Sequence, residues 1–309
     1  MFSILFPGQG SQNIGMAKEL FENFNYVKEY FLNANELLNK NLSKIIFDGP
    51  KNDLDQTENT QPAIFLVSYS FFKVIEKETE FKLKEAKYFA GHSLGEYSAL
   101  CCAEALSFDQ TINLLKRRGA AMQNALPNGE GGMLAILGQT IENINSILKE
   151  NEKKFMCYIA NDNSNGQIVL SGKKINLELL SEILIKKNIK FVKLPVSAPF
   201  HCPLMKNATD EMKNLIIETK FNDPIVNIIS NVTANPLIQS NDIKKFLIEQ
   251  IENPVRWRES INYMIRSGIN RFIEMGPGKV LSGLVKRIDR NVKLNQVNNL
   301  TDIKNLIND

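Results

Sequence analysis

The sequence predicts an α/β fold in which a mostly parallel sheet lies between helices and a smaller α/β domain is inserted into the larger one. Short apolar stretches alternate with stretches of helical amphipathic period over most of the 309 residues, the pattern of a parallel sheet covered by helices. Between residues 133 and 194 the predicted order changes to β-α-β-β-α-β. Hydrophobic residues make up 43% of the chain, enough for one large core and one smaller core.

The predicted elements of the large domain lie on both sides of the insertion. We expect strands at residues 3–6, 88–90, 226–229 and 272–275, and helices at residues 62–75, 109–122, 243–251 and 258–267. Ligands of such sheets bind beyond the carboxyl ends of the strands. Four positions follow these strands closely, and we expect them to meet in one cleft: Gln9, Ser93, Asn231 and Gly276.

The inserted domain is predicted from the order of its elements and from its flanks. We expect strands at residues 133–137, 156–160, 167–171 and 190–194, helices at residues 141–150 and 175–187, and a hairpin turn at residues 161–166. This order is the ferredoxin-like arrangement. A glycine-rich stretch at residues 127–132 marks its entry, and Pro195 and Pro199 mark its exit. We therefore assign residues 127–196 to a ferredoxin-like inserted domain, and residues 1–126 with residues 197–309 to a discontinuous large catalytic domain.

The strongest functional signal is the sequence Gly-His-Ser-Leu-Gly at residues 91–95, between a predicted strand and a helical stretch. A G-x-S-x-G turn holds its serine at strained backbone angles, and its glycines leave out Cβ atoms that would clash. The amides at the start of the following helix would point to where an oxyanion forms. An ordinary glycine-rich turn has the same letters, but the flanking strand and helix favour Ser93 as a nucleophile.

A serine nucleophile needs a base, and the chain has only two histidines, His92 and His201. His92 is the neighbour of Ser93, and adjacent side chains at a sharp turn generally point apart. His201 lies between two prolines, in a loop that leaves a predicted strand and enters a helix expected from Leu204. A lone histidine is more often structural, but such a loop is where a rigid scaffold presents catalytic groups. We therefore favour His201 as the general base over a pairing of His201 with Cys202.

Charge and composition exclude several classes of function. A formal net charge of +3 does not indicate nucleic-acid binding, although local basic groups could receive an acidic partner. No apolar run approaches the length of a membrane span, and no targeting segment is evident. The four cysteines have neither zinc-site nor disulfide-framework spacing, so reduced thiols in a cytoplasmic protein are expected. We expect no metal.

Seven motifs, in this order along the chain, resemble those of malonyl-CoA:acyl carrier protein transacylases of bacterial type II fatty acid synthesis. They are residues 6–12 (FPGQGSQ), residues 91–100 (GHSLGEYSAL), Arg118 with Gly119, the loop ending in His201, residues 230–232 (SNV), residues 250–257 (QIENPVRW) and residues 274–279 (EMGPGK). The last of these lacks the spacing of a phosphate-binding loop. The resemblance spans essentially the whole chain. It implies an α/β-hydrolase-like large domain and a cytoplasmic acyltransferase, which we expect to be a monomer.

The resemblance also implies roles for single residues. Arg118 follows two basic residues, which alone would suggest a solvated helix end, but the helical period separates it from Arg117 by about 100°. In the family, the arginine at this position binds the free carboxylate of the malonyl group. The resemblance assigns the oxyanion hole to the amides of Gln9 and Leu94. It makes the Gln250 carbonyl the group that orients His201.

Two further positions are assigned by resemblance. Asn231 is expected to be a pocket residue. Phe200 stands where many bacterial relatives have a small residue, and its ring should narrow the acyl pocket and favour malonyl over α-methylated malonyl groups.

The implied reaction moves the malonyl group from malonyl-CoA to Ser93 and then to the phosphopantetheine thiol of acyl carrier protein, with no cofactor beyond the coenzyme A thioester. Carrier proteins of this pathway are typically acidic. Two basic groups could therefore dock one: Lys186, Lys187 and Lys190 at the end of the inserted domain, and Lys279, Lys286, Arg287 and Arg290 around the helix expected after Gly278. Two alternatives remain open, a serine hydrolase or thioesterase that uses water, and a non-catalytic carrier-protein-binding module.

Overall fold

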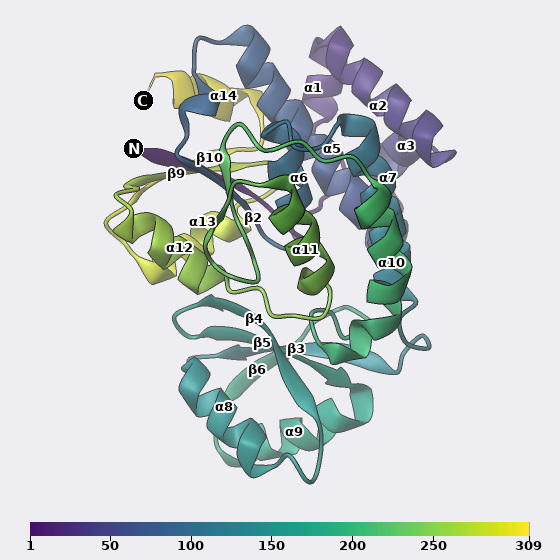
Figure 1. Cartoon of the computed structure of the whole chain (residues 1–309), viewed down its shortest axis with the longest axis vertical. Helices are drawn as coiled ribbons and strands as arrows, with labels where there is room; N and C mark the ends of the chain where they lie inside the picture. The colour runs from purple at the N-terminus through teal and green to yellow at the C-terminus, as the bar shows by residue number, and fades with distance from the viewer. Residues whose placement is uncertain (309) are drawn as a thin grey trace.

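A six-stranded, mostly parallel sheet organises the larger part of the computed structural model, which describes residues 1–308 (Figure 1). The strand order is β10-β9-β1-β2-β7-β8, and only β8 runs antiparallel to its neighbour. The strands are β1 (Phe2–Phe6), β2 (Tyr88–Gly91), β7 (Asn227–Ile229), β8 (Pro236–Leu237), β9 (Arg271–Met275) and β10 (Lys293–Val297).

Helices cover both faces of this sheet because its strands alternate apolar side chains to the two sides. Ile4 and Phe6 join the core shared with α5 to α7, whereas Leu5 joins the core under α12 and α13. The helices of this part are α1 (Lys18–Asn23), α2 (Asn25–Leu38), α3 (Leu42–Asp48), α4 (Lys51–Leu54), α5 (Thr57–Glu78), α6 (Gly95–Cys102), α7 (Phe108–Gln123), α10 (Lys206–Glu218), α11 (Ser240–Gln250), α12 (Trp257–Arg266), α13 (Val280–Ile288) and α14 (Leu300–Ile307), with short 3₁₀ turns at Leu83–Glu85 and Pro203–Met205.

A second, antiparallel sheet lies below the first in Figure 1 and has the order β4-β5-β3-β6. It consists of β3 (Gly131–Leu137), β4 (Cys157–Ser164), β5 (Gln167–Lys173) and β6 (Lys190–Lys193), with α8 (Ile141–Glu150) and α9 (Lys174–Lys186). Leu134 and Ile136 pack with these helices, while Met133 and Ala135 face the core of the larger part. The α/β class and the β-α-β-β-α-β order are confirmed. The domain boundaries at 127 and 196 remain a prediction.

The two sheets are joined at the edge strand β4. Val255, five residues after α11, donates its amide to Ala160 (2.8 Å), and its carbonyl accepts from the Asp162 amide (3.0 Å). The Asp162 carboxylate also pairs with Arg258 of α12 at 2.8 Å. The segment after α11 therefore extends the second sheet as an additional short edge.

The predicted hairpin turn at residues 161–166 is wrong in extent. Asn161, Asp162 and Asn163 continue β4, and only Asn165 and Gly166 form the turn. These polar side chains resemble turn residues, but they are buried against the larger part, where Asp162 pairs with Arg258. Their partners are distant in sequence, so the local pattern could not reveal them.

One other predicted boundary needs correction. The helix predicted at residues 62–75 begins at Thr57 and contains Pro62 in its second turn. The helix predicted at residues 109–122 agrees with α7, and the helix end that the basic run before Gly119 would suggest is not present, because α7 continues to Gln123. The other predicted strands and helices agree with the structure to within about four residues at each end, the usual uncertainty of element boundaries.

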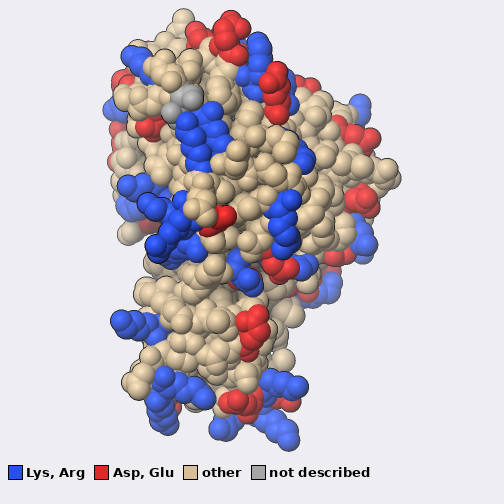
Figure 2. Space-filling model, turned by 90° about the vertical axis from the view of Figure 1, so that its left-hand side faces the viewer, with Lys and Arg blue, Asp and Glu red and all other residues tan. Residues whose placement is uncertain are grey.

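Basic side chains are exposed on both parts of the molecule. No helix among residues 1–308 combines the length and apolarity needed to cross a bilayer. Figure 2 shows several blue side chains on the upper, larger part and others on the lower part. The two basic groups predicted to dock a partner consist of exposed residues and are named here the α9 patch (Lys186, Lys187 and Lys190) and the α13 patch (Lys279, Lys286, Arg287 and Arg290).

Candidate active site

Ser93 stands at the sharp turn between β2 and α6, with a positive φ of 54°. The turn is possible because of its two glycines. A Cβ on Gly91 would lie 1.8 Å from the Gly95 carbonyl carbon, and one on Gly95 would lie 2.2 Å from the Phe6 oxygen. The close approach of strand and helix thus presents the serine hydroxyl beyond the end of β2, as the G-x-S-x-G pattern predicts.

His201 contacts Ser93 directly, although 108 positions separate them in the chain. Its Nε2 lies 2.7 Å from Ser93 Oγ, and its Nδ1 lies 2.8 Å from the carbonyl oxygen of Gln250. A carbonyl only accepts, so Nδ1 carries the proton and Nε2 presents a lone pair to the serine hydroxyl. The arrangement has the geometry of a nucleophile, a base and a group that orients the base.

The electrostatic surroundings keep His201 neutral. Burial, followed by the nearby Arg118 charge, lowers the pKa of His201 from 6.5 to about 3. The imidazole is therefore unprotonated at neutral pH and able to accept a proton. His92 points away from Ser93, as expected, because its Nε2 lies 2.8 Å from Asn163 Oδ1 and its ring packs against Trp257.

Arg118 reaches the same serine from the middle of α7. Its side chain is 0% exposed while Arg117 is exposed, so the helical period separates the two residues as expected. One guanidinium nitrogen donates to Ser93 Oγ (3.1 Å) and to Gln250 Oε1 (2.8 Å), and the other donates to Gln61 Oε1 (2.8 Å). All three acceptors are neutral. Burying a guanidinium without a bonded carboxylate costs on the order of several kcal/mol, so its position favours a functional role.

Asn231 and Gln250 support the site from beneath. Asn231 Oδ1 accepts from the Ser93 amide (2.7 Å), and its Nδ2 donates to the Gly91 carbonyl (2.7 Å). Gln250 Nε2 donates to the Ser93 carbonyl (3.2 Å) and to Glu96 Oε2 (2.7 Å). Asn231 is thus placed to fix the backbone of the turn.

Gln9 and Leu94 line the same cavity as Ser93, and the assignment of the oxyanion hole to their amides remains a prediction. Leu94 caps the N-terminus of α6, and Gln9 follows β1. Within residues 1–308 neither amide donates to a protein acceptor. The positive end of the helix dipole adds to the attraction of a developing negative charge at Leu94.

A cavity of about 150 Å³ brings most of the predicted site residues together. Its walls include Gln9, Ser93, Leu94, Arg118, Phe200 and His201, together with Asn161 and Asn163 of β4. Asn231, Gln250 and Gly276 do not line it. The expectations that Asn231 is a pocket residue and that Gly276 joins the cleft are therefore not met: Asn231 lies under the turn, and Gly276 packs against Pro7 and Ser68.

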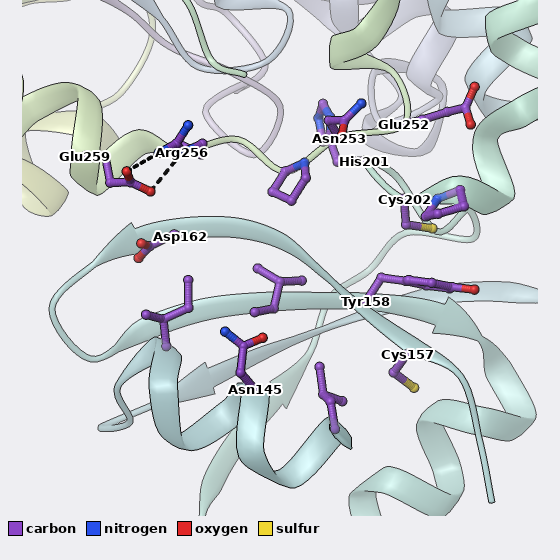
Figure 3. Close-up of a pocket in the computed structure, with 15 residues that line it drawn as sticks. Asn145, Cys157, Tyr158, Asp162, His201, Cys202, Glu252, Asn253, Arg256 and Glu259 are labelled. Atoms are coloured by element: carbon purple, nitrogen blue, oxygen red, sulfur yellow. Dashed lines mark hydrogen bonds and ion pairs between the residues drawn. The ribbon is translucent and has the colours of Figure 1, made fainter. Parts of the chain in front are cut away.

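A larger cavity of about 530 Å³ lies on the other side of His201, between β4, α8 and the segment after α11 (Figure 3). Ser93 and Arg118 do not line it. Arg256 is paired with Glu259, and Asp162 is paired with Arg258. This cavity therefore lacks the nucleophile and the free cationic group of the smaller one.

The cysteines do not form a competing nucleophilic site. Cys202 Sγ donates to the Pro199 carbonyl (3.0 Å), and burial raises the pKa of this thiol to about 12. Burial also raises the pKa of Cys101 and of Cys157 to about 12. Within residues 1–308, His, Cys, Asp and Glu side chains form no group of three suited to a metal ion.

Sequence reasoning missed Gln61 and Glu96. Gln61 accepts from Arg118, and Glu96 accepts from Gln250. A signal for Glu96 was present, because it is the single charged residue in the otherwise buried helix α6. Nothing in the sequence around Gln61 distinguishes it from other polar helix residues.

Comparisons with known proteins agree with this geometry. The acyl transferase domain model matches residues 4–301. The Bacillus subtilis malonyl CoA-acyl carrier protein transacylase is 45% identical over 94% of this chain and 91% of its own length. The Haemophilus influenzae protein of the same name is 36% identical over 97% of this chain and 96% of its own length.

Solved structures give the same result. An acyl-carrier-protein S-malonyltransferase from Bartonella henselae superimposes with a TM-score of 0.96 at 40% identity, over 99% of this chain and 98% of its own. A malonyl-transacylase in complex with its type II PKS acyl-carrier protein gives 0.95 at 35% identity, over 99% of both chains. Ser93 at its strand-to-helix turn, His201 and the buried Arg118 line one cavity, and the likeness to these proteins spans nearly the full length of the chain. The chain therefore belongs to the acyl transferase family, among its malonyl CoA-acyl carrier protein transacylases.

Proposed function

We propose that the protein transfers the malonyl group of malonyl-CoA to the phosphopantetheine thiol of an acyl carrier protein, through a malonyl ester of Ser93, and thereby supplies fatty acid synthesis. It acts as a cytoplasmic monomer and needs no metal or redox cofactor. The observation that carries the proposal is the fully buried Arg118 guanidinium at 3.1 Å from the Ser93 hydroxyl.

In the first half-reaction, His201 Nε2 takes the proton of Ser93 Oγ as that oxygen attacks the thioester carbonyl. The carbonyl oxygen becomes an oxyanion, which the amides of Gln9 and Leu94 receive. The carbon–sulfur bond then breaks, and the coenzyme A thiolate takes the proton from His201. The products are the malonyl ester of Ser93 and the free thiol of coenzyme A.

The second half-reaction reverses these steps with another thiol. His201 takes the proton of the phosphopantetheine thiol, whose sulfur attacks the ester carbonyl. The carbon–oxygen bond to Ser93 breaks, and Ser93 Oγ recovers the proton from His201. Because the same base serves both directions, the Gln250 carbonyl must hold it in one tautomer throughout.

Arg118 supports a substrate with a free carboxylate. A planar guanidinium pairs with a carboxylate through two parallel hydrogen bonds. In the substrate-free protein its acceptors are neutral oxygens of Gln61, Gln250 and Ser93, which a charged carboxylate can replace with a gain in electrostatic energy. Phe200 lines the same small cavity, which supports the expected preference for malonyl over α-methylated groups.

The direct test is to treat the protein with a chelator, mix it with malonyl-CoA and then measure the intact mass of the protein. We expect one malonyl group per chain and its complete transfer when holo acyl carrier protein is added. Methylmalonyl-CoA should add a methylmalonyl group to the protein, at a lower rate. A hydrolase would release free malonate at the same rate without carrier protein. A binding module would gain no mass, and either outcome would refute the proposed transfer.

Arg118→Ala should reduce acylation by malonyl-CoA by about 10- to 100-fold, because a charge-assisted hydrogen bond contributes roughly 1.5–3 kcal/mol. Acetyl-CoA has no free carboxylate, so its acylation rate should stay the same or rise. The measurement is kcat/KM for both thioesters. Equal losses for the two substrates would show that Arg118 is structural rather than a carboxylate ligand, and Arg117→Ala, on the exposed face of the same helix, is the matched control.

The two basic patches lie toward opposite edges of the second sheet. In the α13 patch, Arg287 donates to Gln167 at the β4–β5 hairpin (3.1 Å). In the α9 patch, Lys190 begins the other edge strand, β6, opposite Leu137. Paired residues of neighbouring strands lie on the same face of a sheet, and so do residues two apart on one strand. The Lys190 side chain therefore lies on the same face as Ala135, which points toward the larger part. This placement of the two basic patches supports docking of an acidic carrier protein that spans both edges of the second sheet.

Charge reversal of Lys286 and Arg287 should raise the KM for carrier protein several-fold and leave acylation by malonyl-CoA nearly unchanged. Added salt should weaken the same step, because exposed charges are screened beyond about 8 Å at physiological ionic strength. Reversal of the exposed Lys18 and Lys28 on α1 and α2 is the control. Equal responses of both half-reactions would assign the α13 patch to coenzyme A or to stability instead.

A further inference from the structure

The side chain and backbone of Gln250 connect all three groups that surround the substrate cavity. Its carbonyl accepts from His201 (2.8 Å), its Oε1 accepts from Arg118 (2.8 Å), and its Nε2 donates to the Ser93 carbonyl (3.2 Å). A rotation of this amide by 180° would turn its NH2 group toward the Arg118 guanidinium, which only donates. Catalysis therefore requires one orientation of the Gln250 amide.

Glu96 determines that orientation from the opposite side. Its Oε2 accepts from Gln250 Nε2 (2.7 Å) and from the Asn231 amide (3.1 Å). An ionised carboxylate only accepts, so it requires the NH2 end of the amide and thereby leaves the oxygen for Arg118. The Asn231 backbone held by the same carboxylate oxygen belongs to the residue that binds the Ser93 amide.

We propose that Glu96 is a positioning residue, whose buried carboxylate fixes the Gln250 amide and through it holds His201 and Arg118 in register with Ser93. This role rests on the proposed malonyl transfer. Glu96 is also a carboxylate that acts on Arg118 from within the core, since both side chains are at most 1% exposed. It offsets the arginine charge before a malonyl carboxylate arrives.

The ionisation state of Glu96 makes this role sensitive to pH. The ionisable groups that face it are Arg118 from α7 and Tyr97 from its own helix, while His201 is bonded to the other side of Gln250. Burial raises the pKa of Glu96 from 4.5 to about 7, although Gln250, Asn231 and Arg118 act in the opposite direction. The carboxylate form is therefore lost as the pH falls through about 7, well above the pKa of His201 at about 3.

The test is the pH dependence of acylation in the full-length protein, measured with malonyl-CoA and acetyl-CoA. In the wild type, kcat/KM for malonyl-CoA should fall about 10-fold from about pH 8 to about pH 6, because a protonated Glu96 no longer requires one end of the amide. Glu96→Gln binds no proton and, like the protonated acid, presents one acceptor oxygen and one donor group, so it cannot fix the Gln250 amide. It should be about 10-fold slower than the wild type at about pH 8 and show no further fall over this range.

Glu96→Ala removes the acceptor for two buried N–H groups and should lower kcat/KM for malonyl-CoA by about 10- to 100-fold at every pH. The loss should be smaller for acetyl-CoA, which does not use Arg118. Glu274→Gln is the matched control, since Glu274 is also a buried carboxylate that accepts from two amides, those of Leu281 (2.9 Å) and Ser282 (2.7 Å), but contacts no group of the site. It should keep the wild-type pH profile.

Two results would overturn the role of Glu96: a fall near pH 7 that persists in Glu96→Gln, or a wild-type malonyl rate in Glu96→Ala. An identical change in Glu274→Gln would also overturn it, by showing a general effect of removing buried charge. Wild-type malonylation tests the proposed function separately. If the wild type takes up malonyl normally but Glu96→Gln has the same pH profile as the wild type, the positioning role of Glu96 is refuted and the proposed function is not.

Discussion

Ser93→Ala should take up no malonyl group from malonyl-CoA, whereas the wild type gains one. The substitution removes the oxygen that lies 2.7 Å from His201 Nε2, and the described residues that line the cavity include no other hydroxyl or thiol group. Intact-mass measurement after seconds to minutes of mixing, followed by peptide mapping, locates the label. The expected effect is complete loss of labelling, since covalent transfer has no alternative acceptor.

Folding of Ser93→Ala is checked by its thermal unfolding, which should be close to that of the wild type because alanine keeps the Cβ atom and therefore the same strain at this positive φ. Cys101→Ser is the matched control, because its thiol is buried and its pKa is raised to about 12. Label that persists in Ser93→Ala, or that maps to a cysteine, would show that the nucleophile has been misassigned.

His201→Ala should slow acylation by roughly 10²–10⁴-fold, the range for removal of a positioned general base. Binding of malonyl-CoA should change little, because Arg118 keeps its contacts with Gln61 and Gln250. The rate is measured in a single turnover, which separates acylation from transfer to the carrier protein. The matched control is His92→Ala, which removes the other imidazole in the cavity wall without touching the serine hydroxyl.

A loss of less than about tenfold in His201→Ala would mean that another group takes the serine proton. A comparable loss in His92→Ala would mean that the imidazoles act through packing. Rescue of His201→Ala by added imidazole would support the role as a base, since a diffusible base can restore proton transfer but not packing.

The sequence was most informative about Ser93 and His201, where a local backbone pattern and a scarce chemical group point to the same role. Ser93 could be placed at a strand-to-helix turn because glycine is needed at both flanks, and His201 followed because the chain has only one other histidine. The roles of Gln9, Leu94, Arg118 and Gln250 came from resemblance to a family. The structure puts each in a position compatible with its role.

The remaining features depend on contacts between distant segments. The Gln250 carbonyl that holds His201 has no side-chain signature, and the role of Glu96 could be assigned only once its partners Gln250 and Asn231 were placed. Asn231 lies under the turn rather than in the cavity, because the end of β7 runs beside β2. The spacing of residues along the sequence does not show which strands lie side by side in a sheet.

The short strand-like pairing of Val255 with β4 has a mechanical consequence. Val255 is held on both sides by Ala160 and Asp162, and only four residues separate it from Gln250. The carbonyl that selects the His201 tautomer is thus connected, through the short hydrogen-bonded turn at the end of α11, to the edge of the second sheet. A displacement of the second sheet relative to the first would therefore be transmitted to the acceptor of the catalytic base, so the alignment of His201 depends on a fixed spacing of the two sheets.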